Sequence, residues 1–523
     1  MRYDDIGKKR KTVLNHEGET AYVMTPEMEL YTAVVTCAMS DSFYESTDGR
    51  VERIAALIRK VDPAFVARLA IYARIRMNLR SIPLFLLVEL AGIHNGDSLV
   101  GDAIGRTILR ADEIMELLSC YQWRNAPAGA RKKLGRLSRQ VQNGLKTAFN
   151  RFDEYQFAKY DRSRLEVTLR DALFLVHPKA KDAAQQAVFD KIVAGTLEVP
   201  YTWETRLSAL GQMKFSSEEA HAAAVRALWQ ELIDSDRLGY MALLRNLRNI
   251  LQAGVSDEHI RKVCSRLSDA DAVAKSRQLP FRFLSAYRMI SENGSLRAPM
   301  VLSALEAAAE ASAANIQGFG PDVNVLVAAD TSGSMMCPVS SAGSVMYYDI
   351  GIMLAMLLKS RCASVVSGVF ADRWKVVAMP QNPVLANVMA MRGRVGEVGY
   401  STNGYKVIDW LLDNGVRMDK VMIFTDCQMW NSDPGTWRFG SGSSGASGKA
   451  KASSIQKSWA KYKSRFPGAR LYLFDLAGYG TSPVAFPCHD VALISGWSDK
   501  VFDVLAAIER GADAIAEINA IEI

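Results

Sequence analysis

The spacing of apolar residues along the chain changes once, near residue 318. From about residue 25 to residue 315, apolar residues recur with the period of a helix, and the alternation typical of half-buried strands is scarce. Many helices in series must bury their apolar faces against one another, and a stack of helical repeats achieves this. No fixed repeat length is visible in this part, so we expect the repeats to be irregular.

Several short patterns predict where helices begin in this first part. A capping residue stands before a proline at two places, and a third place has the spacing of a capping box. These starts are Thr25-Pro26, Asp62-Pro63 and Thr168 to Asp171. The apolar stretch 82–93 is too short to span a bilayer and contains Glu89, so it predicts a buried helix.

Beyond residue 318 the pattern becomes that of an α/β domain. Short runs of apolar and β-branched residues alternate with helical stretches, which is typical of a parallel sheet covered by helices on both faces. We predict strands at 323–329, 365–370, 421–425, 471–476 and 491–494, with helices near 350–359, 405–412, 455–465 and 500–510. Three regions follow: an N-terminal segment (1–20), an all-α helical-repeat domain (21–318) and an α/β domain (319–523).

The composition is that of a folded protein and indicates its compartment. The 523 residues are 49% hydrophobic and 23% charged, which excludes disordered and fibrous classes. The seven cysteines are scattered without a C-x-x-C pair, and the charged N-terminus lacks the apolar core of a secretory signal. We therefore expect reduced thiols and a cytoplasmic protein with no membrane span.

Positive charge is concentrated in one stretch. The net charge is +7, and residues 121–151 carry eight basic residues and no acidic one. Placed on one helix, five polar positions share a face, which we call the basic ridge: Lys132, Arg136, Arg139, Asn143 and Lys146. The opposite face is apolar, with Leu134, Leu137, Val141, Leu145 and Ala148. A solvated helix face is the alternative, but the lack of acidic residues favours binding to phosphate groups.

Oxygen-bearing side chains follow the predicted strands of the α/β domain. Strand 323–329 runs into Asp330, strand 421–425 ends at Asp426, and a polar loop precedes the helix between them. Because ligands bind at the carboxyl ends of parallel strands, these loops predict a site for a divalent metal ion, with Mg²⁺ favoured by hydroxyl and carboxylate oxygens. The predicted ligands are Asp330, Ser332, Ser334, Thr402 and Asp426. This set resembles the metal-ion-dependent adhesion site (MIDAS) of von Willebrand factor A domains; a simple turn with a helix cap is the alternative.

Two common enzyme motifs are absent from the sequence. It has no G-x-S-x-G motif of a nucleophile elbow, and Gly448-Lys449 is followed by alanine, so no Walker motif exists. The six histidines are isolated and form no pair with the spacing of a metal site. The sequence therefore supports neither an α/β-hydrolase nor a P-loop nucleotide hydrolase.

Seven short stretches of the helical part, taken in order, point to one family. They are SFYE at 42–45, LAIYAR at 69–74, YQFAKY at 155–160, LFLVHPK at 173–179, YTWE at 201–204, ALLRNL at 242–247 and LPFR at 279–282, and FTD at 424–426 follows them. Together with the adhesion-type site, these stretches resemble the Ro ribonucleoprotein family, which shares the TROVE module. The resemblance covers nearly the whole chain.

The resemblance implies a fold and a set of partners. The fold would be a ring of HEAT-like helical repeats followed by the von Willebrand factor A-like domain. Small noncoding Y-like RNA would bind the basic outer surface, and single-stranded ends of misfolded RNA would enter the ring cavity. The role would lie in RNA quality control or in scaffolding RNA degradation, without catalysis. An exoribonuclease is left open as a further partner, and we expect a monomer.

The ridge and the resemblance together give the candidate RNA-binding residues. They are Arg131, Lys132, Lys133, Arg136, Arg139, Lys146, Lys159 and His177. Arg245 and Arg248 are left open, because either could be a buried structural arginine. The competing hypothesis is a metal-dependent adaptor, in which the A-domain metal captures a carboxylate of a protein partner and the helices form a docking surface.

Overall fold

The computed structural model describes most of the chain. The described residues are 12–15, 20–36, 47–125, 137–161, 166–276, 278, 280–313, 319–339, 343–359, 362, 364–378, 380, 382–429, 453–484, 490–496 and 514–523. The chain folds into two compact units: residues 1–52 with 264–514, and residues 53–263 with 515–523. Neither unit is a single stretch of chain, and this division does not test the predicted sequence boundaries at residues 20 and 318.

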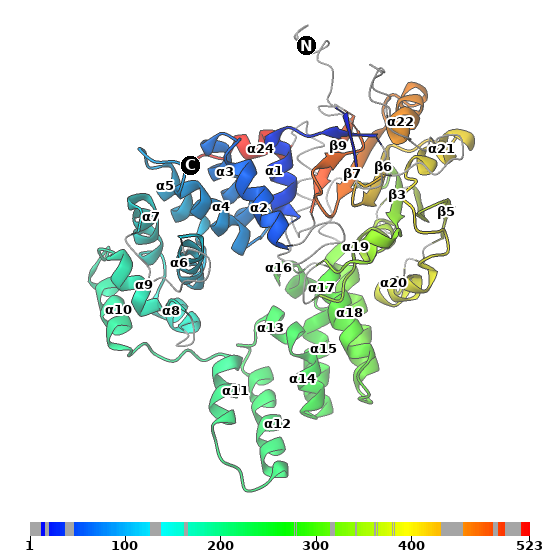
Figure 1. Ribbon diagram of the computed structural model, residues 1–523. Coiled ribbons are helices and arrows are strands. Elements are labelled where there is room, and N and C mark those ends of the chain that lie inside the picture. Colours follow the sequence, from blue (N-terminus) through cyan, green and yellow to red (C-terminus); the bar gives the residue numbers. More distant parts are fainter. Residues whose placement is uncertain are drawn as a thin grey trace. The chain divides into compact units, whose positions relative to one another are not determined.

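From Pro26 to Ser312, the regular elements of the described residues are all helices (Figure 1). They are α1 (Pro26–Val35), α2 (Thr47–Ile58), α3 (Pro63–Ile75), α4 (Ser81–Ala91), α5 (Leu99–Thr107), α6 (Asp112–Asn125), α7 (Arg139–Phe149), α8 (Glu154–Tyr160), α9 (Leu169–Val176), α10 (Ala183–Ala194), α11 (Trp203–Gly211), α12 (Glu218–Asp234), α13 (Tyr240–Arg245), α14 (Leu247–Gln252), α15 (Asp257–Ser268), α16 (Ala270–Ser276), α17 (Pro280–Ser291) and α18 (Ala298–Ser312). Neighbouring helices pack on one another: α3 on α4, α4 on α6, and α5 on α7.

The predicted helix starts are confirmed. The Thr25 hydroxyl accepts a hydrogen bond from the Met28 N–H, and α3 begins at Pro63, although the Asp62 side chain makes no capping bond. Thr168 and Asp171 form the reciprocal bonds of a capping box at the start of α9. The stretch 82–93 lies mostly in the buried helix α4. Among the described residues, no helix is both long enough and apolar enough to cross a membrane.

The α/β part contains a six-stranded sheet whose strand order is β5-β4-β3-β6-β7-β9. The strands are β3 (Asn324–Asp330), β4 (Ser364–Phe370), β5 (Trp374–Val376), β6 (Lys420–Thr425), β7 (Arg470–Asp475) and β9 (Val491–Ser495). All pairings are parallel except that of β4 with the short edge strand β5. The five predicted strands are therefore confirmed, and β5 was not predicted.

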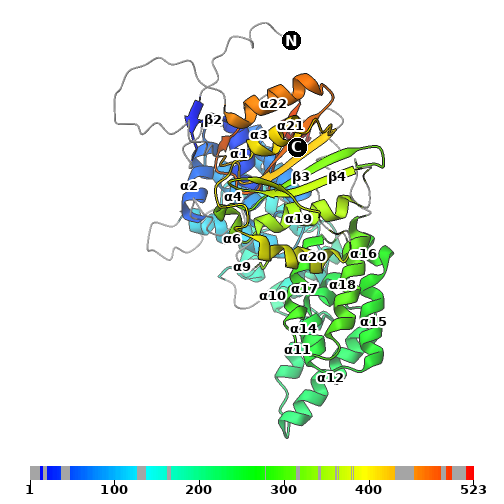
Figure 2. The ribbon, with the colours of Figure 1, turned by 90° about the vertical axis from the view of Figure 1, so that its right-hand side faces the viewer.

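Helices cover both faces of this sheet. They are α19 (Tyr347–Leu358), α21 (Tyr405–Asp413) and α22 (Ser454–Arg465), and Figure 2 shows α19 on one side of the sheet with α21 and α22 on the other. The helix α20 (Val384–Met391) packs on α19. Short 3₁₀ turns, η3 (Gly333–Met336) and η4 (Arg392–Arg394), complete this part. The predicted helix near 500–510 lies outside the described residues.

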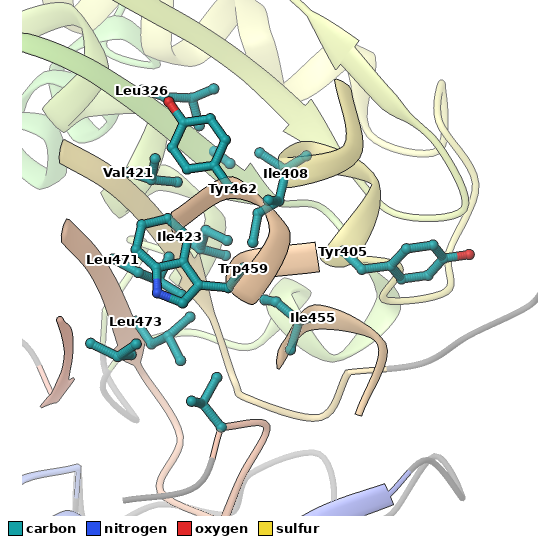
Figure 3. Close-up of a cluster of buried hydrophobic side chains, with 14 of the residues drawn as sticks. Leu326, Tyr405, Ile408, Val421, Ile423, Ile455, Trp459, Tyr462, Leu471 and Leu473 are labelled. Carbon is teal, nitrogen blue, oxygen red and sulfur yellow. The ribbon is translucent and has the colours of Figure 1, made fainter. Parts of the chain in front are cut away.

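Alternate residues of each central strand point to opposite faces, and both faces are apolar. Leu326, Val421 and Leu471 pack under α21 and α22, as Figure 3 shows. On the other face α19 approaches closely, because a Cβ on Gly351 would lie only 2.9 Å from the Cβ of Ala329. The doubly covered parallel sheet that the apolar runs predicted is thus present.

Segments distant in sequence complete each unit. A small antiparallel sheet joins β1 (Thr12–Leu14) and β2 (Thr20–Val23) to β8 (Thr481–Ser482), so the N-terminal segment pairs with the α/β part. In the other unit, α24 (Ala514–Asn519) and the residues after it return to the first helices, where Arg68 Nε donates to the Ile521 carbonyl at 3.0 Å.

Candidate metal and nucleic-acid sites

Asp330, the last residue of β3, is fixed by two hydrogen bonds. Its Oδ1 accepts the Ser332 N–H at 2.8 Å, and its Oδ2 accepts the Thr425 hydroxyl at 2.7 Å. The carboxylate therefore joins the loop after β3 to the end of β6, which is the strand that leads into Asp426. Both aspartates are buried.

The loops that carry the other predicted ligands meet at the same edge of the sheet. The Gly333 N–H donates to the Tyr400 carbonyl at 3.4 Å, and the Asn403 N–H donates to the Ala371 carbonyl at 2.9 Å. The hydroxyls of Ser332 and Ser334 lie 3.3 Å apart. All five predicted ligands, Asp330, Ser332, Ser334, Thr402 and Asp426, are buried side chains at this edge.

The electrostatics of this edge suit a cation. Burial, followed by the charge of Asp426, raises the pKa of Asp330 to about 7. Two buried carboxylates that repel each other are costly unless protons or a cation neutralise them. Cys427 follows with a φ of 60°, a backbone conformation uncommon outside glycine, and burial raises the pKa of its thiol well above the ordinary value.

The donor set fits a small hard cation. Among the residues that the structure describes, no three His, Cys, Asp or Glu side chains come together to hold a metal ion. A metal at this edge would therefore depend on serine and threonine hydroxyls, with two carboxylates to balance its charge. That combination suits Mg²⁺, which keeps several water ligands and needs few carboxylates.

A third buried aspartate at this edge was not predicted. Asp475 ends β7 and stands in register between Thr425 of β6 and Ser495 of β9. Its Oδ1 accepts the N–H groups of Ala477 at 3.3 Å and Gly478 at 2.8 Å. Burial raises its pKa to about 7, and the charge of Asp426 adds to the effect. A signal was available in the sequence, because Asp475 directly follows the apolar run 471–474, as Asp330 follows the apolar run 325–329.

The predicted basic ridge is not one continuous helix. The helix α7 begins only at Arg139, because Ser138 is extended and its hydroxyl accepts the Val141 N–H as an N-cap. The described part of the predicted ridge is therefore Arg139, Asn143 and Lys146. The four predicted RNA-binding residues Arg131, Lys132, Lys133 and Arg136 lie outside the described residues.

The described part of the ridge has the expected two faces. Val141, Leu145 and Ala148 are buried, whereas Arg139 is exposed and Lys146 is partly exposed. Lys159 on α8 is exposed, and so is His177, which ends α9 in a left-handed conformation with φ 48°. The role of these four residues in binding RNA stays a prediction.

Two further cations lie next to the end of α7. Asn150 Nδ2 donates to the Lys146 carbonyl at 3.1 Å and to the Lys179 carbonyl at 2.9 Å, and Asn150 Oδ1 accepts the Lys181 N–H at 2.8 Å. Asn150 thus fastens the exposed segment that carries Lys179 and Lys181 to α7. We call the set Arg139, Lys146, Lys159, His177, Lys179 and Lys181 the α7–α9 basic surface.

Three carboxylates of this region, those of Asp153, Asp171 and Asp182, cap helices. Asp153 Oδ1 accepts the Gln156 N–H at 2.7 Å, Asp182 Oδ1 accepts the Gln185 N–H at 2.7 Å, and Asp171 closes its capping box. A carboxylate at a helix N-terminus is stabilised by the helix dipole and by the N–H groups that it accepts. Lys146 and Lys159 are partly or fully exposed, and no carboxylate of the described residues pairs with either.

Aromatic and arginine side chains also reach the surface here. Tyr155 and Phe174 are each about half exposed, and the guanidinium of Arg110 lies 4.5 Å from the centre of the Tyr160 ring. Exposed rings of this kind can stack with unpaired bases. Arg245 and Arg248 are both exposed, so the interpretation of either as a buried structural arginine is wrong.

The fold and these sites define a class of protein: a series of helices followed by an α/β domain of von Willebrand factor A type, with a basic helical surface. Residues 186–312 match the family model for the TROVE domain. The crystal structure of the Deinococcus radiodurans RO protein is similar at a TM-score of 0.60 and 20% identity, covering 93% of this chain and 100% of that one. The predicted fold class is therefore confirmed.

Characterised proteins show the same likeness. The chain is 25% identical over 313 residues to telomerase protein component 1 of Mus musculus, covering 47% of this chain and 12% of that protein. It is 24% identical over 332 residues to the RNA-binding protein RO60 of Deinococcus radiodurans, covering 57% of this chain and 61% of that protein. The chain thus matches about an eighth of the length of the first and less than two thirds of the second. The resemblance to the Ro family is confirmed.

Proposed function

We propose that this chain is the RNA-binding protein of a small ribonucleoprotein. The observation that carries the proposal is the α7–α9 basic surface, whose nearby carboxylates Asp153, Asp171 and Asp182 cap helices. Exposed cations without carboxylate partners bind phosphates and release counterions. The Deinococcus relative RO60 is named an RNA-binding protein, which points the same way.

The partners proposed are a Y-like noncoding RNA on the basic surface and single-stranded ends of misfolded RNA. A narrow passage lined by helices would admit one strand more easily than an A-form duplex, whose end must first unpair. Recognition would then depend on shape and on exposed ends instead of on base identity. The chain would act in RNA quality control or scaffold RNA degradation by an exoribonuclease, without itself cleaving RNA.

The test removes cations from the α7–α9 basic surface. In Arg139→Gln/Lys146→Gln, the slope of log K against log salt for a structured RNA should become shallower by about two, because each residue would no longer neutralise one phosphate. The matched control is Lys191→Gln/Lys262→Gln, which removes the same charge from lysines held by carboxylates, at 2.6 Å from Glu154 and 3.0 Å from Asp234. The control should bind RNA with the wild-type slope.

Two results would contradict the proposal. An unchanged affinity and slope in Arg139→Gln/Lys146→Gln would make these residues part of a solvated helix face. Equal decreases of affinity in both double variants would show that only net charge matters. A hairpin RNA with and without a 3′ tail tests the second mode, and an affinity independent of the tail would remove it.

We also propose a divalent metal ion, with Mg²⁺ favoured, at Asp330, Ser332, Ser334, Thr402 and Asp426. The support is chemical: two buried carboxylates and three buried hydroxyls converge at one sheet edge, and burial keeps the pKa of Asp330 high in the absence of a cation. A bound cation would neutralise the carboxylates and hold the three loops together. A bound cation could also receive a carboxylate from a protein partner, and the five buried oxygen-bearing side chains at one edge are the observation that favours the adaptor function as a second candidate.

Calorimetric titration with Mg²⁺ or Mn²⁺ tests the metal site. Thr402→Ala should weaken binding, whereas Thr402→Ser, which keeps the hydroxyl, should bind nearly as the wild type does. Asp426→Asn should weaken binding further, because it removes a charge. Equal affinities in all four proteins would show that the metal binds elsewhere, and metal-dependent hydrolysis of RNA or nucleotide would contradict a non-catalytic role.

A further inference from the structure

A second acid-free basic stretch lies in the α/β part of the chain. Residues 434–474 contain eight basic residues and no acidic one. This equals the number of basic residues in the stretch 121–151, which drew attention to the helical part. The described half of the new stretch is α22 and strand β7, so the placement of its charges can be followed residue by residue.

The helix α22 presents a line of cations to solvent. Lys457, Lys461 and Arg465 are spaced four residues apart, so they follow one another along one side of the helix, and all three are exposed. Ile455, Trp459 and Tyr462 point the other way, into the core against the sheet (Figure 3). We call Lys457, Lys461 and Arg465 the α22 stripe.

The carboxylates on neighbouring elements have other partners. Asp409 of α21 accepts the Ser458 hydroxyl at 2.5 Å, and Asp490 accepts the Trp459 indole N–H at 2.8 Å. Asp490 is also 4.0 Å from Lys463, which lies beside the stripe. Within the described part of the chain, no carboxylate comes within ion-pair distance of Lys457, Lys461 or Arg465.

Helix stability explains only the end of the stripe. Cations in the last turn of a helix interact favourably with its dipole, and Arg465 Nη1 also donates to the Leu412 carbonyl at 3.1 Å. Lys457 and Lys461 lie in the first turn and the middle of α22, where the dipole gives a lysine no advantage. These two residues therefore need another explanation.

The chemistry of the surface selects among polyanions. A membrane-binding helix needs an exposed apolar face, but the apolar face of α22 is buried against the sheet. Protein interfaces are enriched in aromatic residues and depleted of lysine, and here the aromatic residues Trp459 and Tyr462 are buried. Exposed lysines without carboxylate partners match the contacts that proteins make with a nucleic-acid backbone.

We propose that the α22 stripe is a second RNA-binding surface, located on the α/β part and reading phosphates without regard to sequence. This inference rests on the proposed RNA-binding function and extends it to a part of the chain outside the TROVE match at 186–312.

The test uses the full chain and a single-stranded uridine oligonucleotide. Lys457→Gln/Lys461→Gln should reduce the salt slope by about 1.4, or 0.7 for each phosphate, and weaken binding about tenfold near physiological salt. Lys457→Arg/Lys461→Arg keeps the charge and should bind as the wild type does. Lys60→Gln/Lys275→Gln is the control, since both lysines are exposed and stand near Asp62 and Asp271 in sequence. An unchanged melting temperature checks that α22 remains folded.

The outcomes separate the two surfaces. A shallower slope in Lys457→Gln/Lys461→Gln, both alone and on top of Arg139→Gln/Lys146→Gln, supports the stripe. If only the stripe variant binds more weakly, the proposed α7–α9 basic surface fails and the stripe stands. Wild-type slope and affinity in Lys457→Gln/Lys461→Gln overturn the stripe, as does an effect seen only with polyglutamate or with phosphatidylserine vesicles, which would assign it to an acidic protein or a membrane.

Discussion

A buried ion pair joins α17 to α19, and its removal should make local unfolding of these two helices more frequent. Arg288 of α17 donates through Nη1 to Asp349 Oδ2 and through Nη2 to Asp349 Oδ1, each at 2.8 Å. Asp349 lies in the first turn of α19 and also accepts the Met346 N–H at 2.8 Å. The two side chains are 8% and 0% exposed, so water cannot replace either partner.

The expected cost follows from this burial. Arg288→Met keeps an apolar chain of similar length but leaves the Asp349 carboxylate with one hydrogen bond in place of three. Breaking a buried ion pair from one side costs about 3–5 kcal/mol, because an uncompensated charge remains. Since each 1.4 kcal/mol is a factor of ten, local opening should become at least about a hundredfold more frequent.

Hydrogen exchange of peptides that cover α17 and α19 measures this opening. The matched control is Arg206→Met, which breaks an exposed pair with Glu231, where the side chains are 41% and 47% exposed. There the decrease in the free energy of local unfolding should be below about 1 kcal/mol, because water screens the charges.

The double variant Arg288→Met/Asp349→Leu shows whether the cost of each single variant comes from the unpaired buried charge that it leaves. Since it leaves no unpaired charge, it should lose less stability than the sum of its single variants. Wild-type protection of α19 in Arg288→Met, or strict additivity in the double variant, would refute the reasoning.

Three other predictions concern packing, capping and protonation. Gly144→Ala should lower the free energy of unfolding by about 1–3 kcal/mol, because its Cβ would lie 2.6 Å from the Gly101 carbonyl oxygen. Gly211→Ala should instead stabilise α11, because no atom lies within 4 Å of the added Cβ. Urea unfolding measures the free energy of unfolding of both variants. Thr168→Ala should cost about 1 kcal/mol and speed hydrogen exchange at the start of α9, because the capping box is broken. The pKa of Asp475, about 7 when folded, lies above its unfolded value, so the folded state holds a proton that the unfolded chain has released. Stability should therefore fall as pH rises from about 4 to 7, and Asp475→Asn in chelator should raise the melting temperature more at pH 8 than at pH 5; an equal rise at both would contradict it.

The sequence predicted those elements whose own residues show the pattern of burial. The five parallel strands were predictable because a strand covered on both faces is apolar at every position, as 421–425 is. Asp330, Ser332, Ser334, Thr402 and Asp426 could be grouped at one edge because parallel strands end there. Their occupancy by metal stays a prediction.

Other features could not be predicted from the sequence, because they depend on competing local hydrogen bonds or on partners far away along the chain. The ridge prediction assumed one helix, but the Ser138 hydroxyl offered the backbone an alternative, and the helix begins after it. The strand β5 is only three residues long, which is too short for a periodic signal. The pairing of Val23 with Thr481 joins residues more than 450 positions apart, and nothing local encodes such a partner.

The exchange of segments between the two compact units has a consequence for synthesis. The strands β1 and β2 cannot complete their sheet before β8 has been synthesised. The helices near Arg68 cannot complete their packing before Ile521 has been synthesised. Each unit therefore contains residues that are made early and residues that are made late in translation. Long chains usually fold one domain after another during synthesis, and neither unit can complete its fold in this way. The helices near Arg68 therefore remain without this contact until Ile521 has been synthesised.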